Sequence, residues 1–152
     1  MKKVDFNFLF DSLPNLYLVV DPNLSIVAVS NSYLEATATK REDILNRNIF
    51  DVFPDDPHDM DANGQENLMD SFNRVKKTLS PHKMPDQKYS IYIESIKKYE
   101  ERWWSPTNFP VLKNGKLEYI YHRVEDITER IEKKKYTLER LKELTDKINF
   151  GE

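Results

Sequence analysis

Strand-like segments stand near both ends of this chain, with helical patterns between them. Residues 16–20 and 26–30 are rich in β-forming side chains, and the turn residues Asp21, Pro22 and Asn23 separate them. Two strands this close in sequence are expected to pair as an antiparallel hairpin. Three more strand-like segments follow in the C-terminal half, at residues 88–94, 101–112 and 117–124. This order predicts an α+β domain built on one antiparallel sheet.

Helix starts and stops mark the middle of the chain. Ser32–Glu35 and Thr39–Glu42 both fit the capping box, in which a hydroxyl and a carboxylate satisfy free backbone N–H groups, so two short helices are expected to begin there. A longer helix is predicted over residues 65–79, where Ser80-Pro81 stops it. Asn114-Gly115 predicts a tight hairpin turn between the last two strands, because both residues tolerate positive φ.

Composition limits the chemistry open to the chain. With 152 residues, of which 39% are hydrophobic, it is large enough for one domain with its own core. It contains no cysteine, which excludes disulfides, thiolate metal sites and cysteine nucleophiles. The net charge is −3 and the basic residues are spread along the chain, so nucleic acid is not an expected partner. The sequence has no apolar run of bilayer length and no signal-peptide pattern. We therefore expect a cytoplasmic protein, in which this segment makes no contact with a membrane.

Four segments, in this order, resemble those of the PAS family. LYLVVDPNLSIVAVSNSYLEAT resembles the first PAS hairpin and helix, and KREDILNRNIFDVFP the helical stretch that follows. ERWWSPTNFPVL and YIYHRVEDITER resemble the last two strands and the exit into a linker helix. The resemblance covers about residues 8–130. It implies a five-stranded antiparallel sheet with helices on one face, with the PAS domain over 15–126 and a long C-terminal helix over 127–152. Separately, Phe6, Leu9, Phe10 and Leu13 recur at helical spacing before Pro14, so an N-terminal amphipathic helix is expected over 1–14.

The resemblance also implies a function by coupling. The chain is similar to the PAS sensor modules of bacterial two-component proteins, the sensor histidine kinases. Such modules detect a ligand, a cofactor or a partner, pass the change to an attached effector, and commonly dimerise. Nothing in the sequence supports catalysis by this segment: there is no nucleophile–base pattern and no glycine-rich phosphate loop.

A ligand pocket is expected between the helices and the inner face of the sheet. Small-molecule pockets are concave and mostly apolar, with a few polar anchors. We expect large side chains to line it and Asn108 or Arg123 to act as anchors. The candidate lining residues are Phe50, Phe53, Met69, Phe72, Tyr89, Trp104, Tyr119 and Tyr121. The alternative is that these side chains simply fill the core.

The sequence does not identify a cofactor. The covalent flavin chemistry of some PAS relatives needs a cysteine, so it is excluded. Haem-binding relatives usually use a histidine on the long helix, and that helix has none. His82 lies just beyond it and His122 on the last strand, so haem is not expected.

A short acidic loop partly matches a calcium-binding loop. Asp59, Asp61 and Asn63 have the spacing of its first oxygen ligands, and Asp70 stands at the closing position. That position ordinarily carries glutamate, and prolines interrupt the incoming segment. The alternative is a solvated loop whose side chains cap the following helix.

The chain ends in a predicted helix with a narrow apolar stripe. Its stripe positions step by alternating four and three residues, the spacing of a coiled coil. They are Ile127, Ile131, Lys134, Leu138, Leu141, Thr145 and Ile148. Asp126 and Thr128 resemble the family's junction, where the strand end is tied to the helix start. We expect a dimerising exit helix; the alternative is a helix folded back on its own domain.

These observations leave three functions open. The first is a sensory and dimerising module that relays a signal through its exit helix to an effector in a longer chain, expected to be a histidine kinase. The second is a ligand-free module for protein interaction and dimerisation. The third is a small-molecule or ion-binding protein that acts alone. A copurifying ligand favours the first or third over the second.

Overall fold

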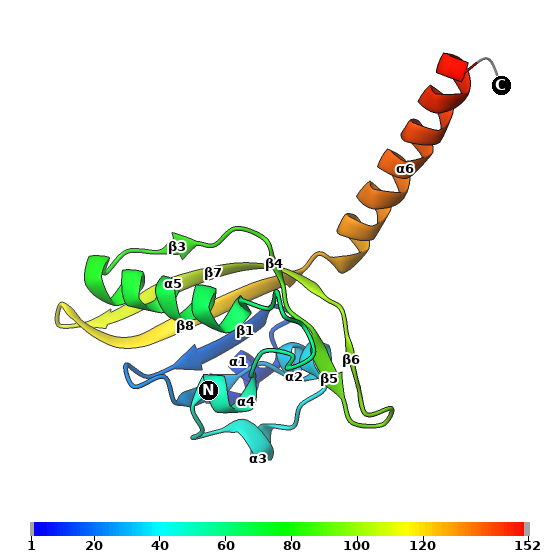
Figure 1. Cartoon of the computed structure of the whole chain (residues 1–152). Helices are drawn as coiled ribbons and strands as arrows, with labels where there is room; N and C mark the ends of the chain where they lie inside the picture. The colour runs from blue at the N-terminus through cyan, green and yellow to red at the C-terminus, as the bar shows by residue number, and fades with distance from the viewer. Residues whose placement is uncertain (1, 151–152) are drawn as a thin grey trace.

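The chain folds into one antiparallel sheet with helices packed mainly on one face (Figure 1). The fold is known from a computed structural model that describes residues 2–150; Met1, Gly151 and Glu152, which belong to the predicted end segments, lie outside the described residues. The helices are α1 (Phe6–Ser12), α2 (Asn31–Thr37), α3 (Arg41–Ile44), α4 (Ile49–Val52), α5 (Gly64–Thr78) and α6 (Thr128–Phe150). The strands are β1 (Leu16–Val20), β2 (Ile26–Val29), β3 (His82–Lys83), β4 (Gln87–Lys88), β5 (Ile91–Ile93), β6 (Lys98–Glu100), β7 (Trp103–Lys113) and β8 (Lys116–Asp126).

The sheet has the strand order β2-β1-β8-β7, and β3 and β4 both pair with the outer edge of β7 as a broken fifth strand. The predicted hairpin between β1 and β2 is present, with Leu18 opposite Val29. The predicted turn between β7 and β8 is also present, and Asn114 and Gly115 both have positive φ, at 52° and 75°. The expected five-stranded antiparallel α+β fold is therefore confirmed.

One predicted strand is wrong. The alternating run at residues 88–94 does not form a single sheet strand. Only Gln87–Lys88 pairs with β7; the chain then leaves the sheet, and β5 forms a separate hairpin with β6. The edge position is shared with β3, which comes from the stretch after Pro81 that had shown no strand pattern. Period-two alternation indicates an extended chain but not its pairing partner.

The two predicted capping boxes are also wrong. Helix α2 begins after Ser30, whose Oγ accepts a hydrogen bond from the N–H of Tyr33 at 3.2 Å. The N-cap of α3 is Lys40, which makes no side-chain cap. A further short helix, α4, follows Asn48, whose Oδ1 accepts from the N–H of Phe50 at 2.9 Å. Several Ser, Thr and Asn residues compete in this stretch, so the sequence alone does not select the cap that tertiary packing uses.

The core lies between the inner face of the sheet and helices α2 to α5. Inward-facing residues alternate along each strand with outward-facing ones, as a half-covered sheet requires. The inner face carries Leu18 and Val20 from β1, and Ile120 and Val124 from β8, all in one buried cluster with Phe72 of α5.

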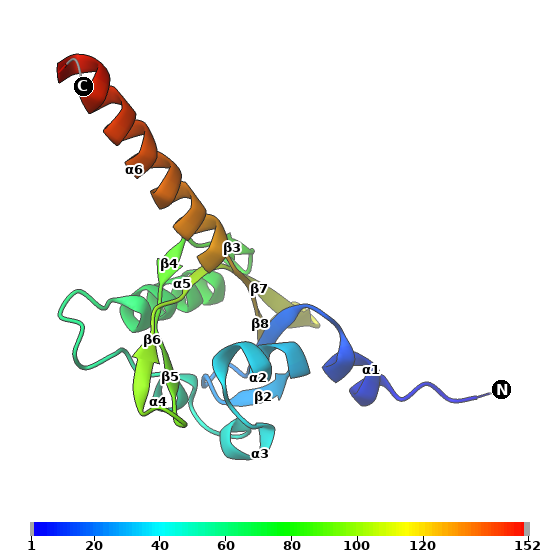
Figure 2. The same ribbon diagram turned by 90° about the vertical axis from the view of Figure 1, so that its right-hand side faces the viewer.

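Helix α1 lies on the opposite face of the sheet (Figure 2). Its Phe10 ring stacks on Tyr17 of β1 with centroids 4.1 Å apart, and the Tyr17 hydroxyl donates to the carbonyl oxygen of Phe10. Burial, with a smaller contribution from Asp11, raises the pKa of Tyr17 to about 12. Phe6 and Phe8 point into solvent, at 73% and 70% exposure. The N-terminal helix therefore uses one aromatic anchor and leaves its other phenylalanines exposed.

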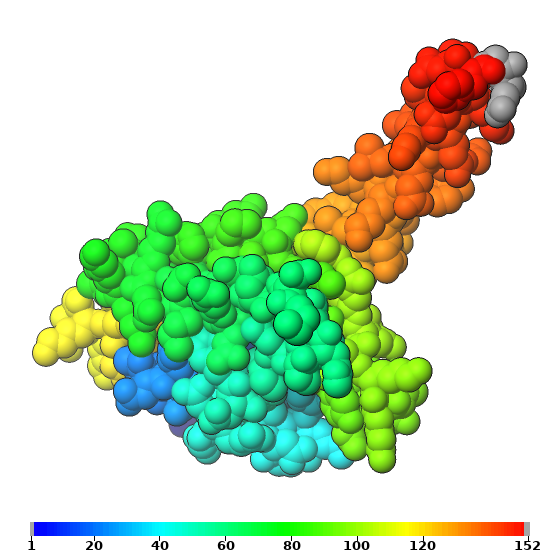
Figure 3. Space-filling model, viewed as in Figure 1, coloured from blue at the N-terminus to red at the C-terminus, as the bar shows by residue number. Residues whose placement is uncertain are grey.

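Helix α6 projects away from the domain (Figures 1 and 3). Ile127, just before it, is buried against the domain, but Leu138, Leu141 and Ile148 are 57%, 55% and 80% exposed. The helix therefore does not fold back on its own domain, which was the alternative expectation. Within residues 2–150, no helix is both long enough and apolar enough to cross a membrane.

Candidate ligand cavity and exit junction

A small cavity lies between the inner sheet face, α4, the start of α5 and the β5–β6 hairpin. Its volume is about 70 Å³. Four predicted residues line it: Phe50, Phe53, Tyr89 and Trp104. The other lining residues, which were not predicted, are Tyr33, Thr37, Ile49, Gly64, Gln65, Leu68, Met84, Gln87, Ile91, Pro106, His122 and Val124. The aromatic side chains fill most of the interior, but they leave this space open.

Five predicted lining residues lie elsewhere in the fold. Tyr119, Tyr121 and Arg123 are on the outer face of β8, because they alternate with the inward residues Ile120, His122 and Val124. The guanidinium of Arg123 lies 5.0 Å from the centre of the Phe109 ring, so it anchors that outer face rather than a ligand. Phe72 and Met69 belong to or border the packed core. The period of two along β8 would have indicated His122 as an inward residue, since Ile120 and Val124 share its face.

Asn108 is buried and does not line the cavity itself, but it contacts His122, which does. Its Oδ1 lies 2.6 Å from Nδ1 of His122, and its Nδ2 donates to Oγ of Ser71 at 2.7 Å. Ser71 in turn lies 2.7 Å from Nδ1 of His82 on β3. A continuous polar chain thus runs from the cavity, through the core, to the edge of the sheet. The predicted anchor is present, but it acts on the cavity through His122.

Burial sets the protonation state of the cavity's polar groups. His122 is only 5% exposed, and the loss of hydration lowers the pKa of its imidazole from 6.5 to about 4, so it is neutral near pH 7. Burial also raises the pKa of Tyr33 and that of Tyr89 well above their usual range, so both phenols stay protonated. Of the residues that the structure describes, no Lys, Arg, Asp or Glu lines the cavity. Its interior is therefore uncharged.

Tyr89 and Gly64 shape one wall of the cavity. The Tyr89 hydroxyl donates to the carbonyl oxygen of Pro54 at 2.7 Å, which fixes the ring over the first residue of α5. A Cβ atom on Gly64 would lie 2.7 Å from Cδ2 of that ring, closer than side chains pack. Glycine is thus required here by the close approach of Tyr89.

The acidic loop before α5 makes hydrogen bonds that explain much of its composition. Asp55 Oδ1 accepts from the N–H of Gln65 at 3.0 Å, and so caps the long helix. Asp59 lies 3.5 Å from Nζ of Lys88 and accepts from the N–H of Asp61. Within residues 2–150, no three His, Asp or Glu side chains converge as a metal site would need. The loop and Asp70 are therefore not brought together as the calcium-loop prediction requires.

The junction between β8 and α6 is tied by a small set of hydrogen bonds. Asp126 Oδ1 accepts from the N–H of Thr128 at 3.0 Å and from its hydroxyl at 2.6 Å. Thr128 Oγ1 accepts from the N–H of Trp103 at 2.9 Å, and the N–H of Ile127 donates to the carbonyl oxygen of Trp103. The first turn of the exit helix is thereby held by β7, not only by the strand that precedes it.

Comparison with known families agrees with this architecture. A family model described as the PAS fold matches residues 10–132. The chain belongs to the PAS family. A PAS domain is a sensory module typical of signalling proteins, and it is not itself catalytic. No curated protein matches the chain in sequence.

Solved structures of PAS domains are similar to this one at low sequence identity. The PAS domain from Bordetella pertussis BvgS is 22% identical, with a TM-score of 0.57 over 93% of this chain and 94% of that one. A sensory box sensor histidine kinase from Vibrio cholerae is 19% identical, with a TM-score of 0.52 over 81% and 89%. An RNA-binding Light-Oxygen-Voltage receptor is 16% identical, with a TM-score of 0.63 over 93% of this chain and 37% of that one. At these identities the similarity shows the fold.

Proposed function

We propose that this PAS domain detects a small ligand in its cavity and relays the change through α6 to an effector. The proposal rests on one observation: Trp103 and Trp104 are adjacent in the chain, and one belongs to the exit junction and the other to the cavity wall. The Trp104 side chain lines the cavity, while the backbone of Trp103 holds Ile127 and Thr128 at the start of α6. One peptide bond therefore separates the cavity wall from the exit junction, and movement of the wall is transmitted to the helix over a short path.

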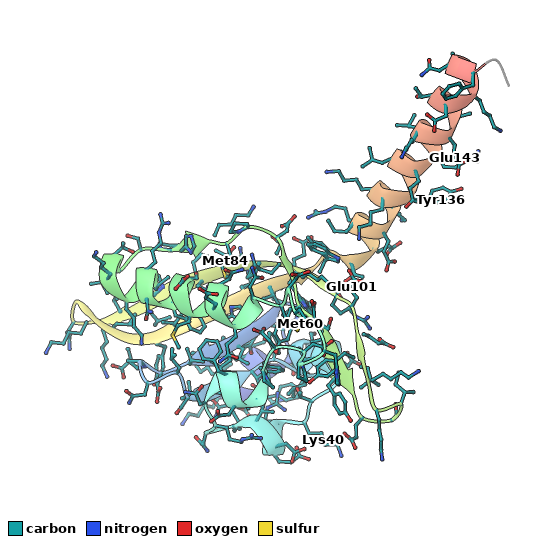
Figure 4. The ribbon with its side chains drawn as sticks, viewed as in Figure 1. Lys40, Met60, Met84, Glu101, Tyr136 and Glu143 are labelled. Atoms are coloured by element: carbon teal, nitrogen blue, oxygen red, sulfur yellow. The ribbon has the colours of Figure 1, made fainter. Side chains whose placement is uncertain are left out.

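The second part of the proposal is that two chains pair through α6. The helix leaves Leu138, Leu141 and Ile148 exposed at coiled-coil spacing, and burial of such a stripe between two copies is favourable. Tyr136 and Glu143 stand on the projecting part of the helix, clear of the sheet (Figure 4). Parallel helices that shift between two packings would carry the signal onward.

A histidine kinase is the effector we propose. Support comes from the similar structure of a sensory box sensor histidine kinase. It also comes from the exit helix, which would transmit the signal to another domain if it continued into one. The proposed compartment is the cytoplasm.

A second candidate function is a ligand-free interaction and dimerisation module. The observation that favours it is the small size of the cavity, about 70 Å³, since most of the interior is filled by aromatic side chains. In that case signals would reach the domain through the exposed faces of α1 or the sheet.

Native mass spectrometry of the purified chain separates these functions. A dimer that carries a small molecule supports the ligand sensor, and a clean apo dimer supports the interaction module. The relay is then tested with a spin label, because the chain has no cysteine and Lys142→Cys creates a single labelling site on α6. We expect the α6–α6 distance to differ between loaded and stripped dimers. Identical distances in both states would refute the relay.

Thr128 provides the matched variants for this experiment. Thr128→Val keeps the shape of the side chain but removes the oxygen that accepts from Trp103. We expect this variant to bind the molecule and to lose the distance change. Thr128→Ser retains the hydroxyl and should behave as the wild type.

A further inference from the structure

The contacts of Asn108, in the polar chain behind the cavity, indicate which end of its side-chain amide donates and which accepts. The side-chain amide nitrogen of Asn108 lies 2.7 Å from Ser71 Oγ and 3.4 Å from the Met84 thioether, which only accepts hydrogen bonds. Met84 belongs to the segment that joins β3 to β4 (Figure 4). The amide therefore turns its NH₂ group toward Ser71 and Met84, and its oxygen toward His122.

This orientation fixes the tautomer of His122. A carbonyl oxygen cannot donate, so the proton in the 2.6 Å contact belongs to His122 Nδ1. A neutral imidazole with its proton on Nδ1 presents a lone pair at Nε2. Ser71 accepts from Asn108 and lies 2.7 Å from Nδ1 of His82, so the Asn108 amide has a partner for its oxygen and for its nitrogen.

Among residues 2–150, three polar side-chain groups that line the cavity make no hydrogen bond to protein: the amide of the half-buried Gln65, and two groups on buried residues. Among residues 2–150, no protein atom forms a hydrogen bond with His122 Nε2 or with the Tyr33 hydroxyl, although both residues line the cavity and are over nine-tenths buried. Their rings meet edge to face, with centroids 6.3 Å apart. Neither atom is fully enclosed by protein, so both face the cavity space and are available to hydrogen-bond a ligand there.

We propose that the cavity binds a small uncharged molecule that donates an O–H or N–H hydrogen bond to Nε2 of His122, with the Tyr33 hydroxyl as the second polar contact. The proposal rests on the sensory function proposed above and names its ligand class. The rest of the ligand is apolar, because Phe50, Ile91 and Trp104 form the surrounding wall.

The charge and the size of the cavity restrict the class of ligand further. A carboxylate would meet the lone pair of Nε2, and no cationic side chain among residues 2–150 lines the cavity to balance it. An ammonium group would likewise find no carboxylate among the described lining residues. The cavity volume of about 70 Å³ is less than half of the roughly 150 Å³ that admits benzene, so the buried part of the ligand has few heavy atoms.

Histidine-labelled protein and two isomeric probes test this site. Butan-1-ol carries the O–H donor, and its isomer diethyl ether has the same atoms but only an acceptor. Nitrogen-15 spectra of the three imidazoles report the tautomer of His122 and any hydrogen bond at Nε2. We expect the Nδ1–H tautomer in the free protein, a saturable Nε2 shift with butan-1-ol, and about tenfold weaker binding of the ether. Butanoate and butylammonium should not bind.

Variants and outcomes complete the test. Tyr33→Phe removes only the hydroxyl and should weaken the binding of both isomers, because the oxygen of each can accept from it; the preference for butan-1-ol, which depends on His122 Nε2, should remain. Equal binding of the two isomers, no Nε2 shift, or an Nε2–H tautomer would each overturn the proposal. Butan-1-ol binding without an α6 distance change refutes the relay but leaves this site intact. A copurified ion or a molecule without a donor that does move α6 refutes this site but leaves the relay intact.

Discussion

Trp104 donates the N–H of its indole ring to the backbone carbonyl oxygen of Tyr89 at 3.0 Å. Trp104 belongs to β7 and Tyr89 to the segment between β4 and β5, so this bond fastens the β5–β6 hairpin to the sheet. Both residues line the cavity. The same hydrogen bond therefore joins two walls of the cavity and links them to the strand that supports the exit helix.

Trp104→Phe tests this bond. The substitution keeps an aromatic ring but leaves the Tyr89 carbonyl without its donor, so we expect a loss of about 1–3 kcal/mol in the free energy of unfolding. Urea unfolding followed by circular dichroism measures it. Trp103→Phe is the matched control, because the Trp103 indole bonds only to the exposed Glu101 carboxylate, and it should cost less than about 1 kcal/mol. Equal losses in the two variants would contradict this role.

Gly64→Ala should destabilise the domain although alanine is the better helix former. The new Cβ would lie 2.7 Å from the Tyr89 ring, which its bond to Pro54 holds in place. We expect a cost of about 1–3 kcal/mol from this overpacking. In a Tyr89→Leu background the clash is relieved, so the same substitution should be nearly neutral. Additive losses in this double-mutant cycle would show that Tyr89 is not the obstacle.

The stability of the domain should fall as the pH is lowered from about 6.5 to 4. Burial lowers the pKa of His122 from 6.5 to about 4, so in this interval the unfolded chain binds a proton that the folded chain does not. The free energy of unfolding is therefore highest above pH 6.5, where His122 is neutral in both states. It is lower by about 3 kcal/mol once the pH is below 4.

Unfolding free energies of the wild type and His122→Gln across this pH range check the prediction. The difference between the two curves should shrink as the pH falls, because only the wild type has the buried imidazole. His58→Gln removes a histidine that is exposed in the loop before α5, and it controls for the loss of one histidine. Parallel curves for the wild type and His122→Gln would show that His122 does not cause the dependence.

Lysine in place of Leu138 and Leu141 should convert a dimer into a monomer. Both side chains are more than half exposed in the single chain and stand on the apolar stripe of α6. Charges on that stripe would face each other in a coiled coil, where burial is costly. Sedimentation equilibrium gives the mass. Thr137→Lys adds one positive charge off the stripe and should leave the dimer intact, so the single variant Leu138→Lys is its matched partner. A dimer that survives the double lysine variant would place the interface elsewhere.

Much of the fold follows from local patterns in the sequence. The hairpin at residues 16–30, the Asn114-Gly115 turn and the long helix near residues 65–79 were predictable, because turn chemistry and apolar periodicity act over a few residues. The β5–β6 hairpin was not, since residues 88–94 alternate like a sheet strand. Their separation from the sheet depends on contacts such as Trp104 to Tyr89, between residues that are distant in sequence.

The α+β order of elements, the absence of thiol chemistry and the amphipathic exit helix follow from composition and local spacing, and the resemblance of four short segments indicated the PAS family. The set of side chains that forms the cavity depends instead on how distant elements pack together. The period of two places His122 on the same face of β8 as Ile120 and Val124, and Tyr121 and Arg123 on the other. His122 faces inward because the helices, among them α5 with Phe72, pack on the first of these faces. The joining of Asn108, Ser71 and His82 behind His122 likewise needs three separate elements to meet, and no local pattern records that meeting.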